Sequence, residues 1–218
     1  MSTVAIIPAR YASSRLAEKL LLDLGGKSVL QRTYQQAAQA KLITKVIIAT
    51  DDERIYKHAE SFGAEVYMTS TEHQSGTDRI AELALKNLDW QIIVNVQGDE
   101  PFINPADIDL ALEPFIHDPL LQMTSLYHEI TDPDEINNPN NVKVVTDING
   151  NAMYFSRAAI PFDRDRQSKT TNEVDRHVAL RAPRDDGIYK KHIGLYAYRR
   201  ETLLLLAGLA QTELEKTE

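Results

Sequence analysis

The segment that most constrains this chain is an apolar, β-branched run from Ile92 to Val96 that ends in Gly98-Asp99-Glu100-Pro101. Such a run is typical of a parallel strand that is buried on both faces, and glycine and proline end it. We therefore predict that Asp99 lies just past the carboxyl end of a central strand, where ligands bind in open α/β sheets. A carboxylate at that place suits Mg²⁺ carrying a phosphate, whereas a plain turn residue would give the same pattern.

Strand and helix patterns alternate along the first half of the chain, and this alternation predicts an α/β fold with a doubly wound, mostly parallel sheet. Helices are expected to begin after Ser28, at Asp51-Asp52-Glu53, after Ser75 and near Pro105. The expected strands are Val4–Ile7, Lys45–Thr50, Ala64–Met68 and residues 91–96.

From about residue 120 the pattern changes. Asn149-Gly150 is a strong hairpin signal, with strands expected on either side of it. The strands expected in this part are residues 121–127, 141–147, 152–156 and 190–198, followed by a helix over 200–209. Residues 162–190 are highly polar and are expected to form a long surface excursion, whereas Tyr154 and Phe155 are expected in the core. We therefore predict one α/β nucleotide-binding domain over residues 1–218, with a β-rich insertion at about 120–198.

Composition excludes several classes of protein. With 218 residues and 43% hydrophobic content the chain can bury a sizeable core, and the absence of cysteine excludes disulfides and thiolate metal sites. A net charge of −8 argues against a nucleic-acid partner. No apolar stretch approaches the roughly 20 residues of a membrane span, and no signal peptide is recognisable, so we expect no membrane partner and a cytoplasmic location.

A cationic loop follows the first expected strand of this acidic chain. Arg10, Arg15 and Lys19 lie there with the hydroxyls of Ser13 and Ser14. Guanidinium and ammonium groups on such a loop are suited to a polyphosphate, although a solvated charged loop would have the same composition. The loop has neither the GxxxxGK[ST] of a P-loop nor the GxGxxG of a dinucleotide fold, so ordinary ATPase and NAD-binding functions lose support.

The motifs together resemble the 3-deoxy-manno-octulosonate cytidylyltransferases, the CMP-Kdo synthetases of lipopolysaccharide biosynthesis. The matching segments are Ile7–Leu16, Ala49–Asp51, His73–Arg79, Asn95–Pro101, Asn138–Val145, Tyr154–Arg157 with Ile160-Pro161, and His192–Tyr198. The resemblance implies a nucleotide-diphospho-sugar transferase-like fold and Mg²⁺-dependent transfer of CMP from CTP to the anomeric hydroxyl of Kdo, with release of pyrophosphate. It also implies a homodimer whose interface uses the β-rich segment.

Roles for individual residues follow from the same resemblance. Arg10, Lys19 and Asp99 are expected to be catalytic, with Asp99 as the metal ligand. The expected nucleotide-binding residues are Ala9, Arg10, Ser14, Arg15, Lys19, Thr50, Asp51, Ser75, Gly76 and Arg79. The expected sugar-binding residues are Gln97, Arg157 and His192, with Arg157 making a fork to the sugar carboxylate. The simpler alternatives are a surface cation for Arg157, a strand-edge histidine for His192 and a helix cap for Ser75.

The chain departs from the family at two places. Ala17-Glu18 stand where the family has Pro-Gly, which changes the stiffness of the loop and adds a negative charge beside the phosphates. The chain ends at Glu218, before a final stretch in which the family carries another metal-binding Asp, so the C-terminal end of the family is expected to be missing.

Other functions remain open at the level of sequence. The acceptor could be a related acid sugar, such as 8-amino-Kdo or a sialic acid. A sugar-1-phosphate nucleotidyltransferase would carry a G-x-G-T-R loop near its start, and this loop is absent here. A catalytically impaired nucleotide-binding homologue is the third alternative, against which the intact Asp99 and Arg157 argue.

Overall fold

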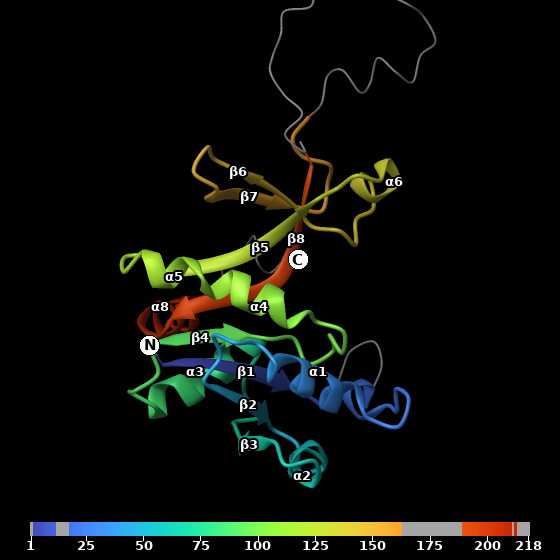
Figure 1. The fold of residues 1–218 in the computed structure, drawn as a ribbon, viewed down its shortest axis with the longest axis vertical. Helices are drawn as coiled ribbons and strands as arrows, with labels where there is room; N and C mark the ends of the chain where they lie inside the picture. Colours follow the sequence, from blue (N-terminus) through green and yellow to red (C-terminus); the bar gives the residue numbers. More distant parts are fainter. Residues whose placement is uncertain (1, 12–17, 163–188, 211, 213–218) are drawn as a thin grey trace, which may run out of the picture. The chain divides into compact units, whose positions relative to one another are not determined.

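The computed structural model describes residues 2–11, 18–162, 189–210 and 212. The chain forms two compact units (Figure 1). The first comprises Met1–Ser125 with Gly194–Glu218, and the second comprises Leu126–Ile193. Among the described residues, no helix has the length and apolar character that crossing a membrane requires.

The sheet of the first unit contains four parallel strands, β1 (Thr3–Ala9), β2 (Lys45–Thr50), β3 (Glu65–Met68) and β4 (Ile92–Asn95). Their order is β3-β2-β1-β4, and all three contacts between neighbours are parallel. The last part of β8 (Lys190–Arg199) adds an antiparallel strand beside β4. The predicted mostly parallel sheet is therefore confirmed, and the strand beside β4 that runs antiparallel is β8, the last described strand in the sequence.

Helices connect and follow these strands, and most begin where a side chain caps them. The caps of α1, α2, α3 and α4 are Ser28, Asp52, Ser75 and Asn104, whose oxygens each accept a backbone N–H of the first turn. The helices are η1 (Lys19–Leu21), α1 (Val29–Ala37), α2 (Glu53–Ser61), α3 (Gly76–Lys86), α4 (Pro105–Leu112), α5 (Pro114–His117) and α8 (Arg200–Ala207). The sequence did not predict η1 and α5, because three or four residues are too few for a helical period to be seen.

The order of the strands reverses next to β1. The chain steps outward from β1 through β2 to β3, and α3 then carries it back to β4 on the other side of β1. α3 and α8 contact each other, and they bury a core cluster that includes Ile6, Ile93 and Tyr198. The carboxyl ends of β1 and β4 therefore lie at a topological switch point, the usual place for a ligand in a doubly wound sheet.

Two glycines let loops approach Pro8 closely at this switch point. A Cβ atom on Gly76 would lie 3.2 Å from Cγ of Pro8, and one on Gly98 would lie 3.1 Å from the Pro8 carbonyl oxygen. Both distances are tighter than ordinary side-chain packing tolerates. The start of α3 and the loop after β4 are therefore drawn against the end of β1.

The second unit is built from antiparallel strands, and the hairpin predicted around Asn149-Gly150 lies in it. Here β6 pairs with β7 on one side and with the first residues of β8 on the other, and Gly150 with φ 85° makes the turn of the β6–β7 hairpin. A small apolar cluster of Ile130, Ile136 and Tyr189 lies in this unit. Its elements are the later part of β5 (Met123–Glu129), α6 (Pro133–Ile136), β6 (Lys143–Thr146) and β7 (Ala152–Ser156).

The expectation that Tyr154 and Phe155 lie in the core is wrong. Their side chains are 58% and 41% exposed, and their neighbour Met153 is 69% exposed. The apolar run is real, but it lies on a hairpin strand paired with β6, and four of its five residues are exposed. The polar excursion predicted over 162–190 lies almost entirely outside the described residues.

Candidate active site

The residues that the sequence assigns to a nucleotide lie at the carboxyl ends of neighbouring strands. Ala9 at the end of β1 is in register with Thr50 at the end of β2, and both are fully buried. Arg10 and Asp51 are the next residues after them and are partly exposed. Asp99 follows β4, so the prediction that it lies just past a central strand is confirmed.

Lys19 and Asp99 form an ion pair at the switch point. The Lys19 ammonium lies 2.5 Å from Oδ2 of Asp99, and the two side chains are 43% and 44% exposed. Leu20 anchors η1 because it is buried and faces the space above Gly98. The hydroxyl of Thr33 on α1 donates to the Gly98 carbonyl at 3.0 Å, which fixes the loop that carries Asp99. The cation and the carboxylate are therefore held together by two anchored segments, η1 and the loop after β4.

The acidic residues beside this pair fit a magnesium ion that arrives with a nucleotide. Magnesium commonly takes one or two protein carboxylates and completes its shell with phosphate oxygens and water. The half-exposed Asp99 can supply one carboxylate. Its neighbour Glu100 is less suited to the role, because burial and the Asp99 charge raise the pKa of Glu100 and disfavour its charged form. No group of three or more His, Cys, Asp or Glu side chains suited to a metal occurs among the residues that the structure describes.

A cavity of about 350 Å³ opens beside Arg10 and Asp51. Arg10 donates from Nη2 to the carbonyl of His73 at 2.6 Å, so its guanidinium is held at the wall of this cavity. The lining residues are Arg10, Tyr11, Asp51, Asp52, Arg54, Thr71 and His73. The cavity has both the cations that phosphates need and the carboxylates that sugar hydroxyls can donate to.

Tyr11 and Arg54 extend the site in a way that no motif predicted. The hydroxyl of Tyr11 donates to the carboxylate of Glu18, and the guanidinium carbon of Arg54 lies 3.1 Å from the centre of the Tyr11 ring. Arg54 also makes two bonds to Asp52, at 2.6 and 2.9 Å. Glu18 has φ 63°, a left-handed conformation that favours glycine. The loop therefore keeps the backbone shape that glycine favours, although Glu18 stands there.

Arg79 lies beneath the site and not on its surface. It is fully buried, and its Nη2 lies 2.5 Å from Oδ2 of Asp51. Its Nη1 donates to the hydroxyl of Thr69 and, at 3.3 Å, to the carbonyl of Ser70. Nε of Arg79 has no partner among the described residues. The role the geometry supports for Arg79 is to hold Asp51 and the loop after β3 in place, while contact with the nucleotide stays a prediction.

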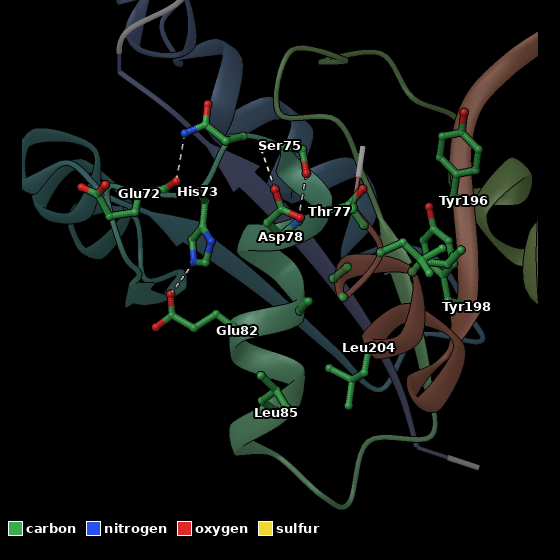
Figure 2. A pocket seen from close by; sticks show the side chains of 17 residues that line it. Glu72, His73, Ser75, Thr77, Asp78, Glu82, Leu85, Tyr196, Tyr198 and Leu204 are labelled. Atoms are coloured by element: carbon green, nitrogen blue, oxygen red, sulfur yellow. Dashed lines mark hydrogen bonds and ion pairs between the residues drawn. The ribbon is translucent and has the colours of Figure 1, made fainter. Parts of the chain in front are cut away.

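Ser75 opens α3 as a helix cap. Its hydroxyl accepts from the Asp78 amide and the Asp78 carboxylate accepts from the Ser75 amide, both at 3.0 Å, which makes a capping box. Ser75 also lines a larger pocket of about 1070 Å³ between α3, the preceding loop, β8 and α8 (Figure 2). The capping alternative is therefore confirmed, and a nucleotide contact by the same residue stays a prediction.

Glu82 on α3 fastens the loop that holds Arg10. Figure 2 shows the His73 ring directed at the Glu82 carboxylate, with Nε2 and Oε2 2.7 Å apart. The same oxygen accepts from the Ser70 amide at 2.8 Å, and Lys86 donates to the other oxygen at 2.6 Å. Burial opposes the Glu82 charge, but the bonds from Lys86, Ser70 and His73 outweigh it and lower the pKa to about 2.

The expected sugar-binding residues are divided between the two units. Gln97 is half-buried in the loop after β4, in the first unit. In the second unit, Nη1 of Arg157 donates to the Pro139 carbonyl at 3.1 Å. The His192 and Phe155 rings pack edge-on with their centres 4.9 Å apart, and burial lowers the pKa of His192. Ser14 and Arg15, which are expected to bind the nucleotide, lie outside the described residues.

A doubly wound sheet that presents cations and a carboxylate at its switch point has the architecture of an α/β nucleotidyltransferase. Residues 4–218 match the protein-family model described as cytidylyltransferase, and the chain therefore belongs to the cytidylyltransferase family.

Individual relatives are similar to this chain over 99% or more of its length. It is 47% identical over 215 residues to a 3-deoxy-manno-octulosonate cytidylyltransferase from Solibacter usitatus, which covers 99% of this chain and 78% of that protein. A protein of the same name from Trichlorobacter lovleyi is 47% identical over 218 residues, covering 100% and 83%. A solved structure of CMP:2-keto-3-deoxy-manno-octonic acid synthetase complexed with CTP superposes with a TM-score of 0.86 at 37% identity, covering 100% of this chain and 82% of that one.

Proposed function

We propose that this chain transfers CMP from CTP to the anomeric hydroxyl of 3-deoxy-manno-octulosonate and releases pyrophosphate, a step of lipopolysaccharide biosynthesis. The observation that carries the proposal is the Lys19–Asp99 pair at the switch point. It occurs in a chain that is similar over its full length to a synthetase solved with CTP. A cation for the leaving phosphates and a carboxylate for a metal are the two charges that this reaction needs at its centre.

The chemistry is a direct in-line displacement. The sugar hydroxyl attacks the α-phosphorus and loses its proton to solvent, and the bond to the pyrophosphate oxygen breaks as the new P–O bond forms. Arg10 and Lys19 bind the triphosphate and stabilise the charge that develops on the leaving pyrophosphate. Asp99 would hold Mg²⁺, which when bound lowers the cost of bringing an anionic sugar acid to an anionic phosphate. No covalent intermediate with the enzyme is needed.

The acceptor is a sugar acid, and Arg157 supports that class. Its guanidinium can make two parallel bonds to a carboxylate, and it is exposed on the second unit. Hydrogen bonds from Gln97 and from His192 to a sugar acid stay predictions. The names of the relatives favour Kdo over 8-amino-Kdo or a sialic acid. Because the reaction consumes the nucleotide CTP, we infer a cytoplasmic location.

A test of this function is pyrophosphate release measured over a panel of nucleotides and sugar acids. We expect release with CTP and Kdo in the presence of Mg²⁺, and none when either substrate is omitted. Asp99→Asn is the matched control, because it removes the charge and keeps the shape of the side chain. A preference for another sugar acid would replace Kdo as the acceptor. Release with a sugar 1-phosphate and no sugar acid would contradict the proposed class of reaction.

We also propose that the chain forms a homodimer through β7. Met153, Tyr154 and Phe155 are consecutive large side chains that are 69%, 58% and 41% exposed in the single chain, and a second copy would remove apolar surface from water. Sedimentation should give a dimer for the parent and a monomer for Tyr154→Glu. Leu88→Glu is the control, because Leu88 is 77% exposed on the first unit. A parent that sediments as a monomer at micromolar concentration would contradict the proposal.

A further inference from the structure

Lys143, on β6 of the second unit, is a charged residue buried in an unusual way. Its side chain is fully buried, although lysine is rarely buried without a partner. No ion pair with a carboxylate is found for it among the described residues. Its ammonium instead donates to three backbone carbonyls, those of Asn138 at 3.1 Å, Asn141 at 2.7 Å and Arg157. An ammonium has three N–H groups, so these carbonyls use all of them.

The three carbonyls belong to two segments that are separate in sequence. Asn138 and Asn141 lie in the turn before β6, and Arg157 is the first residue after β7. The Arg157 side chain returns to the same turn, because its Nη1 donates to the Pro139 carbonyl at 3.1 Å. Lys143 therefore holds the backbone of Arg157 directly. It also holds the Asn138–Asn141 turn, and the Pro139 carbonyl of that turn accepts a bond from the Arg157 guanidinium.

The positive charges of Lys143 and Arg157 lie near each other and favour the binding of an anion. Burial and the nearby Arg157 charge both lower the pKa of Lys143. Arg157 is exposed, and it makes no ion pair with any residue that the structure describes. Of its five N–H donors one is used in the bond to Pro139, which leaves the fork free to take a carboxylate. A carboxylate bound to Arg157 would offset part of this positive charge.

We propose that Lys143 is a positioning residue that sets the place and direction of Arg157 for the carboxylate of the sugar acid. The inference rests on the proposed function, in which Arg157 binds that carboxylate. Lys143 does not touch the sugar. It acts by holding the Asn138–Asn141 turn and the Arg157 backbone at a fixed separation.

The first experiment is a double-mutant cycle between Lys143→Met and Arg157→Ala. Lys143→Met alone should raise the KM for Kdo about tenfold and change the KM for CTP less than about twofold. In the Arg157→Ala background, Lys143→Met should have little further effect, because the side chain it positions is gone. Lys190→Met is the control, since it removes the same charge from the neighbouring strand, where Lys190 donates to the Thr146 hydroxyl at 2.8 Å.

Two results of the cycle would overturn the proposal. Effects of the two substitutions that simply add would mean that Lys143 acts independently of Arg157. Equal rises in both KM values would mean a general structural role. Lys143→Gln, which keeps two donors without the charge, serves if Lys143→Met does not fold, and the same cycle is then measured with it. If neither variant folds, Lys143 is a residue of the fold alone and the proposal is wrong.

A second readout separates this inference from the proposed function. The ¹⁵N signal of the Arg157 Nε–H group, identified by its loss in Arg157→Ala, reports the surroundings of the guanidinium without any substrate. We expect this signal to shift in Lys143→Met and to stay in place in Lys190→Met. An unchanged signal overturns the positioning role, whereas failure of the parent to release pyrophosphate with Kdo contradicts only the proposed function.

Discussion

The Lys19 ammonium and the Asp99 carboxylate neutralise each other at 2.5 Å, although 80 positions separate them in the sequence. In the proposed reaction each of them has a different partner, since Lys19 binds the triphosphate and Asp99 the metal. Binding of CTP with Mg²⁺ would therefore replace the pair by two new contacts of the same charge type. The exchange is inexpensive because an exposed ion pair contributes only about 0–1 kcal/mol.

We expect Asp99→Asn and Lys19→Met to affect different steps. Asp99→Asn should lower kcat by about a hundredfold or more, because the metal loses its charged ligand. Lys19→Met should raise the dissociation constant for CTP more than that for CMP, because its partner is among the outer phosphates. Calorimetry and initial rates measure both effects. Urea unfolding should change by less than about 1 kcal/mol for either variant. A turnover for Asp99→Asn within about tenfold of the parent would remove Asp99 from the mechanism.

Arg79→Met should destabilise the fold. Arg79 is fully buried and Asp51 only partly exposed, so removal of the guanidinium leaves a carboxylate without its partner. Breaking a buried pair in this way costs about 3–5 kcal/mol, which urea unfolding will measure. Lys57→Ala is the control, because it breaks an exposed pair with Glu53 on α2 and should cost no more than about 0.5 kcal/mol. Equal losses for the two variants would contradict the buried role of Arg79.

Glu82 should make stability depend on acidity between about pH 4.5 and 2. Its pKa is lowered from 4.5 to about 2 in the folded chain, so the unfolded chain takes up the proton first as the pH falls. The stabilisation, on the order of 3 kcal/mol, is complete above pH 4.5 and is lost as the pH falls through the folded pKa. Glu82→Gln should remove this part of the pH dependence in urea unfolding, whereas the exposed Glu53→Gln should leave it. An unchanged slope in Glu82→Gln would contradict the assignment.

Glu18 should weaken CTP binding and strain its loop. Glu18→Gln removes the negative charge and keeps the side-chain shape, so we expect a lower KM for CTP at low salt and a smaller gain at high salt. Glu18→Gly should in addition relieve a left-handed conformation that costs a non-glycine residue about 1 kcal/mol. Glu60→Gln, on the exposed side of α2, is the control. A KM for CTP that rises in Glu18→Gln would show that the bond from Tyr11 matters more than the charge.

Local rules predicted the elements of this fold well because their signals are short-range. Ser28, Asp52 and Ser75 cap helices through bonds to amides two or three residues away, and Gly150 turns a hairpin between adjacent strands. The same rules failed for Tyr154 and Phe155. An apolar run indicates side chains whose burial is favourable, but it does not indicate whether other residues of the same chain pack over them.

The sequence by itself determined the strands and the longer helices, but not the short η1 and α5, and it placed Arg10, Asp51 and Asp99 at strand ends. Only the tertiary structure decided which of these side chains meet. The Lys19–Asp99 and Arg79–Asp51 pairs each join residues from different strand–helix units of the first sheet. Such contacts depend on the order of the strands and on the crossover through α3, and neither is encoded in the spacing of any one motif. That is also why the sequence motif contains Lys143 without indicating what its ammonium holds.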